Sequence, residues 1–194
     1  YKVKTEWIKA DLTDEKSVKD MFDSLEKKLG SIDVLVNNAG ISSVKMLCDT
    51  SLEEWDRVHD VNLKSAFLCS KKASENMVHN KWGRIINISS VWGQVGASCE
   101  VAYSSSKAAL IGFTKALAKE LGPSGITVNC VCPGIIDTQM NDHLSNEEKK
   151  AICEEIPVGR MGTSNEVAHA VGFLVDEESS YITGETISVN GGWF

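Results

Sequence analysis

The spacing of hydrophobic positions alternates between two periods along the chain. In residues 13–29 the apolar side chains recur every three or four positions and Gly30 follows, which predicts an amphipathic helix that ends at this glycine. Residues 32–36 form a short continuous apolar run, which is typical of a buried strand, and the turn sequence 37–40 follows directly. The first 40 residues therefore predict a helix, a buried strand and a turn.

The alternation continues to the end of the chain. Ser51 and Glu54 have the spacing of a capping box and open a long helical segment that contains Trp55 and Met77. Further strands are predicted at residues 84–88, 126–131 and 186–189, and further helices at residues 102–121, 146–155 and 165–175. Because helices of this length connect successive strands, the strands are expected to run parallel with helices on both faces. The 194 residues therefore predict one α/β domain, a doubly wound parallel sheet in a three-layer α/β/α arrangement.

Composition and charge exclude several classes of protein. With 27 acidic and 20 basic residues the net charge is −7, which disfavours nucleic acid and anionic membrane surfaces as partners. The chain has neither an apolar run approaching the roughly 18 residues of a membrane span nor the layout of a secretory signal, so a cytoplasmic location is expected. The six cysteines include no Cys-x-x-Cys pair, so we expect reduced thiols and no metal site.

Polar and small residues follow three of the predicted strands, at the sheet edge where ligands bind in this architecture. They are Asn37 to Gly40, Ser89 and Ser90, and Pro133 and Gly134. Tyr103 and Lys107, on the following helix, are four residues apart and therefore project from one face. A nearby ammonium stabilises a phenolate, which lowers the pKa of the phenol toward that of a general acid or base. The pair alone also fits an exposed helix surface.

The motifs as a set resemble the short-chain dehydrogenase/reductase family, and the resemblance covers essentially all 194 residues. The matching positions, in order, are Asn37 to Gly40, Asn62, Ser90, Tyr103, Lys107, Pro133, Gly134 and Thr138. The resemblance implies a Rossmann-type fold and an NAD(P)-dependent oxidoreductase, in which a nicotinamide supplies the hydride and the protein supplies position and electrostatics.

The resemblance implies a role for each of four residues. Tyr103 would give its proton to the carbonyl oxygen of the substrate, and Lys107 would lower the pKa of Tyr103 and bind the nicotinamide ribose. Ser90 would orient and polarise the carbonyl, and Asn62 would hold the water that links Lys107 to solvent. A non-catalytic nucleotide-binding regulator is the alternative of another class, and the presence of all four residues favours an enzyme.

The resemblance also implies a set of cofactor contacts, although tight-turn backbone explains several of them equally well. Asp11, with its neighbour Leu12, matches the residue that contacts the adenine. The other contacts implied are Asn38, Ala39, Gly40, Pro133, Gly134, Ile136 and Thr138, together with Tyr103 and Lys107. The family begins with a strand, a glycine-rich turn, a helix and a second strand, so we expect roughly 45 further residues before Tyr1. The residue that distinguishes NAD from NADP falls in that segment. Of the two cofactors, NADP(H) is favoured over NAD(H).

The substrate is expected to be a ketone, either a small molecule or one bound to a carrier protein. Residues 181–192 look like those of the 3-oxoacyl-acyl-carrier-protein reductase branch, which acts on 3-oxoacyl thioesters. Residues 89–101 and 155–160, with Gly191, Gly192 and Trp193, resemble instead the bacterial reductases of the 5-aminopentanone group on a lysine of translation elongation factor P. The 3-oxoacyl thioester is the favoured substrate, and the 5-aminopentanone group stays open as the alternative.

Three further expectations follow from the resemblance. Residues 97–101 would place Cys99 and Glu100 at the substrate entrance, although a surface loop is an equal alternative. Residues 140–144, with His143, fall where the family commonly has a mobile lid. The long helices that begin near Ser51 and Ala102 resemble those that pair across a two-fold axis, so a homotetramer is expected.

Overall fold

The computed structural model describes residues 3–142 and 144–194, which form an α/β fold around a four-stranded sheet. The strands are β1 (Val34–Asn37), β2 (Gly83–Ile88), β3 (Ile126–Pro133) and β4 (Thr186–Val189). The helices are α1 (Glu15–Leu29), α2 (Leu52–His59), α3 (Ser65–Asn80), α4 (Trp92–Val95), α5 (Val101–Leu121), α6 (Asn146–Glu155) and α7 (Ser164–Val175). The strand order is β1-β2-β3-β4 and every neighbouring pair is parallel, so the fold class predicted from the sequence is confirmed.

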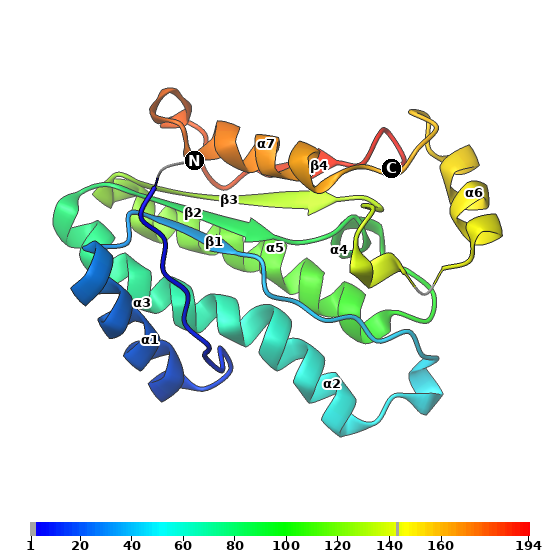
Figure 1. The fold of residues 1–194 in the computed structure, drawn as a ribbon, viewed down its shortest axis with the longest axis horizontal. Coiled ribbons are helices and arrows are strands. Elements are labelled where there is room, and N and C mark those ends of the chain that lie inside the picture. Colours follow the sequence, from blue (N-terminus) through cyan, green and yellow to red (C-terminus); the bar gives the residue numbers. More distant parts are fainter. Residues whose placement is uncertain (1–2, 143) are drawn as a thin grey trace.

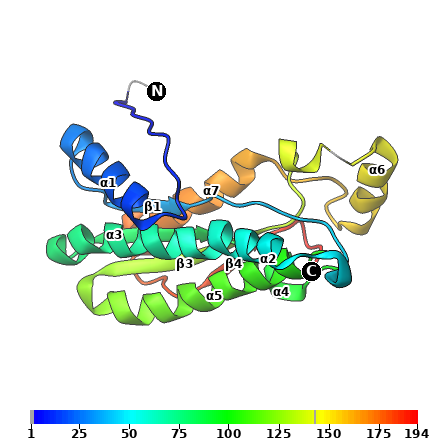
Figure 2. The ribbon, with the colours of Figure 1, turned by 90° about the horizontal axis from the view of Figure 1, so that it is seen from below.

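Helices cover both faces of the sheet (Figure 1). Successive residues of a strand point to opposite faces, and β2 divides in this way. Ile85 packs with side chains of α1, α3 and α5, whereas Ile86 and Ile88 pack with Leu174 of α7. Figure 2, seen from below, shows α3 and α5 running along the sheet with α1 beside α3. Both faces of β2 are therefore buried, which explains why its apolar residues do not alternate with exposed polar ones.

Capping boxes start three of the helices. The Ser51 hydroxyl accepts a hydrogen bond from the Glu54 backbone at 3.2 Å, and the Glu54 carboxylate accepts one from the Ser51 backbone. The same exchange occurs at Thr163 and Glu166, as the sequence predicts. These contacts satisfy N–H groups that have no partner within the helix, and so they fix the residue at which each helix begins.

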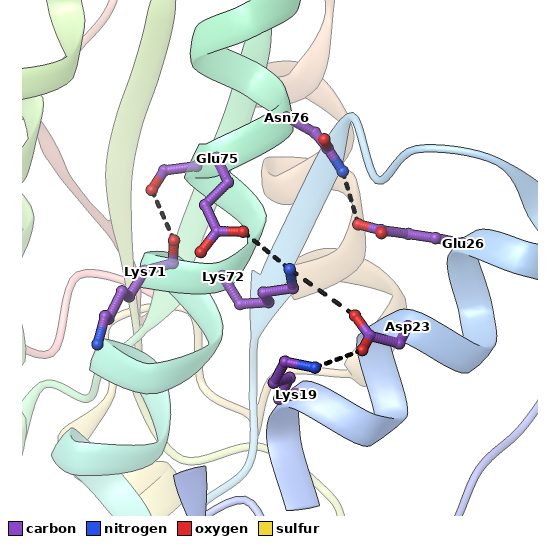
Figure 3. A network of polar contacts seen from close by, with 8 residues as sticks. Lys19, Asp23, Glu26, Lys71, Lys72, Glu75 and Asn76 are labelled. Carbon is purple, nitrogen blue, oxygen red and sulfur yellow. Dashed lines mark hydrogen bonds and ion pairs between the residues drawn. The ribbon is translucent and has the colours of Figure 1, made fainter. Parts of the chain in front are cut away.

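A polar network joins α1 to α3 (Figure 3). Lys72 lies 2.8 Å from Glu75 on its own helix and 3.8 Å from Asp23 on α1. Asn76 donates to the Glu26 carboxylate at 2.6 Å. Such partly exposed ion pairs contribute little each. The apolar contacts of Val18 and Phe22, both only 2% exposed, therefore account for most of the attachment of α1.

The structure differs from the sequence prediction in two elements near the site. The single long helix predicted from Ser51 is interrupted by a π-helical turn, Asp60–Lys64, so α2 and α3 are separate helices on one path. The short helix α4 was not predicted. One extra residue in a turn hardly alters the hydrophobic periodicity, and a four-residue helix has too few positions to show one.

His143, which belongs to the expected lid segment, lies outside the described residues. No helix in the described part of the chain is both long enough and apolar enough to cross a membrane.

Candidate active site

Two cavities meet at the carboxyl ends of the strands. The first, of about 690 Å³, contains ten of the thirteen predicted site residues: Asn38, Ala39, Gly40, Ser90, Tyr103, Lys107, Pro133, Gly134, Ile136 and Thr138. The second, of about 520 Å³, is lined by Trp92, Glu100, Trp193 and several apolar side chains. Ser90 and Tyr103 line both cavities. The two hydroxyls therefore stand where a molecule in one cavity would meet a molecule in the other.

Tyr103 lies in the first turn of α5 and is 8% exposed. Burial raises the pKa of Tyr103 above its ordinary value, and a hydrogen bond with the Ser90 hydroxyl opposes part of that shift. Desolvation outweighs the remaining influences on the phenolate, so the net shift of the pKa is upward. At neutral pH the phenol is therefore protonated and able to act as an acid. The lowering of this pKa by Lys107, expected from the sequence, stays a prediction.

Lys107 lies one turn further along α5, with its ammonium 5.7 Å from the centroid of the Tyr103 ring. Its Nζ donates a hydrogen bond of 2.8 Å to the carbonyl oxygen of Ile88 at the end of β2. The side chain is 4% exposed, and burial lowers the pKa of Lys107 from 10.5 to about 8. The amine is thus still mostly charged at neutral pH, at a cost to the folded state.

The loop after β2 presents Ser90. The Ser90 oxygen accepts a hydrogen bond from the Trp92 backbone at 3.1 Å, while Ser89 points the other way and donates to the Lys107 carbonyl at 2.8 Å. Gly93 makes this close approach possible, because a Cβ there would lie 2.8 Å from both the Ser89 oxygen and the Lys107 backbone. The loop and α5 are therefore held together directly beside the two hydroxyls.

Asn62 lies in the π-helical turn and is 1% exposed. Its Oδ1 accepts from the Ile41 backbone at 2.8 Å, and its Nδ2 donates to the Ile41 carbonyl at 3.0 Å and to the Ser106 hydroxyl at 2.9 Å. The side chain thus ties the turn after β1 to α5 from behind the cavity. The described contacts give Asn62 a positioning role, while the water relay expected from the sequence stays a prediction.

The residues of the first cavity fit a nicotinamide dinucleotide. An ammonium has three N–H donors, and within the described chain the only hydrogen bond of the Lys107 amine is to Ile88, which leaves donors for sugar hydroxyls. At Gly40 a Cβ would lie 3.3 Å from both the Lys107 amine and the Asn62 oxygen, so a side chain there would crowd that amine. Pro133 and Gly134 end β3 at the same edge, which is where dinucleotides bind in doubly wound sheets.

Two predicted cofactor contacts lie elsewhere in the described structure. The Asp11 carboxylate accepts hydrogen bonds from the backbone and hydroxyl of Thr13, at 2.9 and 2.8 Å, and these contacts lower its pKa. Leu12 packs against the core beneath α1. Neither residue is among those that line the two cavities, so an adenine contact for them stays a prediction.

Comparison with known proteins places the chain in a family. A family model described as enoyl-(acyl carrier protein) reductase matches residues 1–194. The 3-oxoacyl-(acyl-carrier-protein) reductase FabG of Aquifex aeolicus (strain VF5) is 47% identical over 194 residues, which are 100% of this chain and 78% of the relative. The chain belongs to the short-chain dehydrogenase/reductase family.

Two further relatives of this short-chain dehydrogenase/reductase carry the same name. The FabG of Staphylococcus aureus (strain Mu50 / ATCC 700699) is 45% identical over 187 residues, 96% of this chain and 76% of the relative. That of Escherichia coli (strain K12) is 43% identical over 183 residues, 94% of this chain and 75% of the relative. The family resemblance stated from the sequence is confirmed, and the chain is an NAD(P)-dependent oxidoreductase. These relatives lend no support to a non-catalytic regulator.

Several contacts at this short-chain reductase site were not predicted from the sequence. Trp92 and Trp193 line the second cavity although they are far apart in the sequence. Asn37 donates to Asn87 at 2.8 Å, and Asn87 donates to Thr114 at 2.9 Å, so a buried polar chain crosses from β1 to α5. The signal for it was present, because an asparagine within an otherwise apolar strand needs a partner.

Proposed function

We propose that this protein reduces a 3-oxoacyl group on an acyl-carrier protein to the 3-hydroxyacyl group, with NADPH as hydride donor. One observation carries the proposal: Ser90 and Tyr103 lie between a cavity that suits a dinucleotide and a cavity that suits an acyl group. The names of the three relatives supply the substrate class.

The residues of the chain divide the work of carbonyl reduction. A nicotinamide, when bound, would supply the hydride for the carbonyl carbon. The Ser90 hydroxyl donates a hydrogen bond to the carbonyl oxygen and fixes its orientation. The buried phenol of Tyr103, protonated at neutral pH because its pKa is raised, gives its proton to that oxygen as negative charge develops there. The Lys107 ammonium, 5.7 Å from the ring, then stabilises the phenolate that remains.

The proposal includes the identity of the cofactor and its contacts. We assign Asn38, Ala39 and Gly40 to the dinucleotide, together with Pro133, Gly134, Ile136 and Thr138 at and after the end of β3. As cofactor we propose NADP(H) rather than NAD(H).

We also propose that the protein is a homotetramer. Large apolar side chains are exposed on the long helices, with Phe67 of α3 47% exposed and Val101 of α5 41% exposed. Light scattering during size-exclusion chromatography tests the assembly, since a monomer at micromolar concentration would contradict it.

One observation favours the second ketone considered above, the 5-aminopentanone group on elongation factor P. Glu100 lines the second cavity, as do Trp92 and Trp193, and its carboxylate accepts a hydrogen bond from Ser42 at 2.9 Å. A cavity lined by a carboxylate and aromatic rings suits a protonated amine. The relatives compared above do not support this reading, so it ranks second.

Oxidation of NADPH and NADH by the full-length gene product tests the proposal. Acetoacetyl-pantetheine and a 5-aminopentanone peptide are offered in parallel, beside a Tyr103→Phe variant. We expect NADPH-dependent turnover of the thioester, which falls by a factor of about 10²–10⁴ in the variant because the acid is removed. Turnover of the peptide alone would replace the first substrate by the second. Failure to bind either nucleotide would overturn both.

A further inference from the structure

The C-terminal segment of the chain returns to the second cavity. The strand β4 is followed by Asn190, Gly191, Gly192, Trp193 and Phe194. Trp193 lines the second cavity together with Ser90 and Tyr103, which come from distant parts of the sequence. The proposed function leaves this tryptophan without a role.

The turn that aims Trp193 is fixed by its neighbours. Gly191 and Gly192 have φ angles of 66° and 82°, which residues with a side chain rarely adopt. A Cβ at Gly191 would lie 2.8 Å from Ile156, the residue after α6, so only glycine lets the chain pass this close. Asn190 clamps the turn, because its Oδ1 accepts from the Gly192 backbone and its Nδ2 donates to the Phe194 carbonyl, both at 3.0 Å. The indole is thus placed by a rigid turn.

Contacts on both sides hold the indole of Trp193. Its ring meets that of Trp92 edge to face, with centroids 5.1 Å apart. Its Nε1 donates a hydrogen bond of 3.4 Å to Glu155 at the end of α6. The Trp92 backbone in turn donates to Ser90, so the two tryptophans form a wall that begins two residues from the proposed carbonyl-binding hydroxyl.

Much of the lining of the second cavity is apolar. Val44, Met140, Leu144 and Ile152 line this space of about 520 Å³ together with the two tryptophans. An acyl chain whose carbonyl reaches Ser90 and Tyr103 would extend along this lining. A flat ring in the wall of this cavity limits how long or branched that chain is, since the ring cannot move aside without breaking its contacts with Trp92 and Glu155.

We propose that Trp193 is a specificity-determining residue. Together with Trp92 it restricts the site to ketones whose carbonyl carbon carries a short alkyl chain. The proposal rests on the proposed ketone reductase function and adds the length of chain that the reductase accepts. The indole contributes apolar contact to a short chain and obstructs a long one. Removal of the indole is therefore expected to weaken the binding of short substrates and to strengthen the binding of long ones.

Binding and turnover of acetoacetyl- and 3-oxooctanoyl-pantetheine by the full-length, NADPH-loaded protein test the inference. In Trp193→Ala we expect the ratio of the two dissociation constants, measured by calorimetry, to change by roughly tenfold in favour of the longer chain. A change of this size corresponds to the loss of part of one buried aromatic contact. Trp193→Phe retains a ring and should restore most of the selectivity. Phe194→Ala is the matched control, because Phe194 touches both tryptophans but is not among the cavity-lining residues.

The two readouts separate the two proposals. A shifted binding ratio supports the wall even if no thioester is reduced, in which case only the proposed function fails. An unchanged ratio in Trp193→Ala, or a shift of equal size in Phe194→Ala, overturns the wall whatever the turnover. Failure of both thioesters to bind the wild-type protein also overturns it.

Discussion

Replacement of Lys107 by methionine should stabilise the protein while it destroys the site. Burial lowers the pKa of Lys107 from 10.5 to about 8, so holding the charged amine inside the folded protein is unfavourable. One pKa unit corresponds to about 1.36 kcal/mol, which puts the penalty at roughly 3 kcal/mol at pH 7. The variant also leaves the Ile88 carbonyl without its donor, at a cost of about 1 kcal/mol. The expected net gain is about 2 kcal/mol in the free energy of unfolding.

The sign of the pH dependence follows from the same shift. Between pH 8 and 10.5 the unfolded chain binds a proton at Lys107 that the folded protein has already released, so this lysine makes the wild-type protein more stable as pH rises through that window. The penalty is fully present below pH 8. The gap between Lys107→Met and wild type should therefore narrow by about 2 kcal/mol from pH 7 to pH 9.5.

Urea unfolding followed by circular dichroism at the two pH values measures both effects. Lys115→Met is the matched control, because Lys115 is exposed on the same helix and its replacement should leave stability within about 0.5 kcal/mol. Turnover and NADPH-induced stabilisation should be lost only in Lys107→Met. A variant that is less stable than wild type at pH 7, or whose gap does not change with pH, would refute the reasoning.

The remaining predictions concern the packing around the site and the core. Asn62→Ala removes three buried hydrogen bonds and should lower the free energy of unfolding by about 2–4 kcal/mol, measured by urea unfolding, together with turnover. Gly83→Ala places a Cβ 2.6 Å from the sulfur of buried Met77 and should cost about 1–3 kcal/mol, whereas Gly112→Ala, with nothing within 4 Å, should not destabilise; thermal unfolding distinguishes them. Burial raises the pKa of Cys69 to about 11, so an aromatic disulfide reagent at pH 8 should label this thiol only in step with urea unfolding, whereas the exposed Cys48 should react in the native protein; rapid labelling of Cys69 itself, located by peptide mapping, contradicts this.

The sequence was most informative where one periodicity or one spacing decides the structure. The buried strands β2 and β3 were predicted to within two residues, because both faces of each strand are covered and each strand therefore contains a dense cluster of apolar residues. Tyr103 and Lys107 were placed on one helix by their spacing, and the structure brings them together with Ser90 at one cavity.

Other features depend on contacts that a local pattern does not contain. The direction of the Tyr103 pKa shift depends on burial by other elements, which the spacing of Tyr103 and Lys107 does not reveal. The π-helical turn around Asn62 was missed because Asn62 is held from outside its helix, by Ile41 and Ser106. Likewise, the contact between Trp92 and Trp193 joins residues 101 positions apart.

The position of the two groups on α5 bears on how a protein of this kind can change its substrate. Tyr103 and Lys107 are one turn apart on α5, and this helix packs against the sheet. Leu121, at the C-terminal end of α5, lies in the core. Most of the lining of the second cavity comes instead from residues outside α5, among them Trp92, Leu144 and Trp193. Mutations can therefore alter one wall at a time without moving the acid relative to its ammonium. The substrate preference of such a molecule can therefore change by mutation while its catalytic activity is kept.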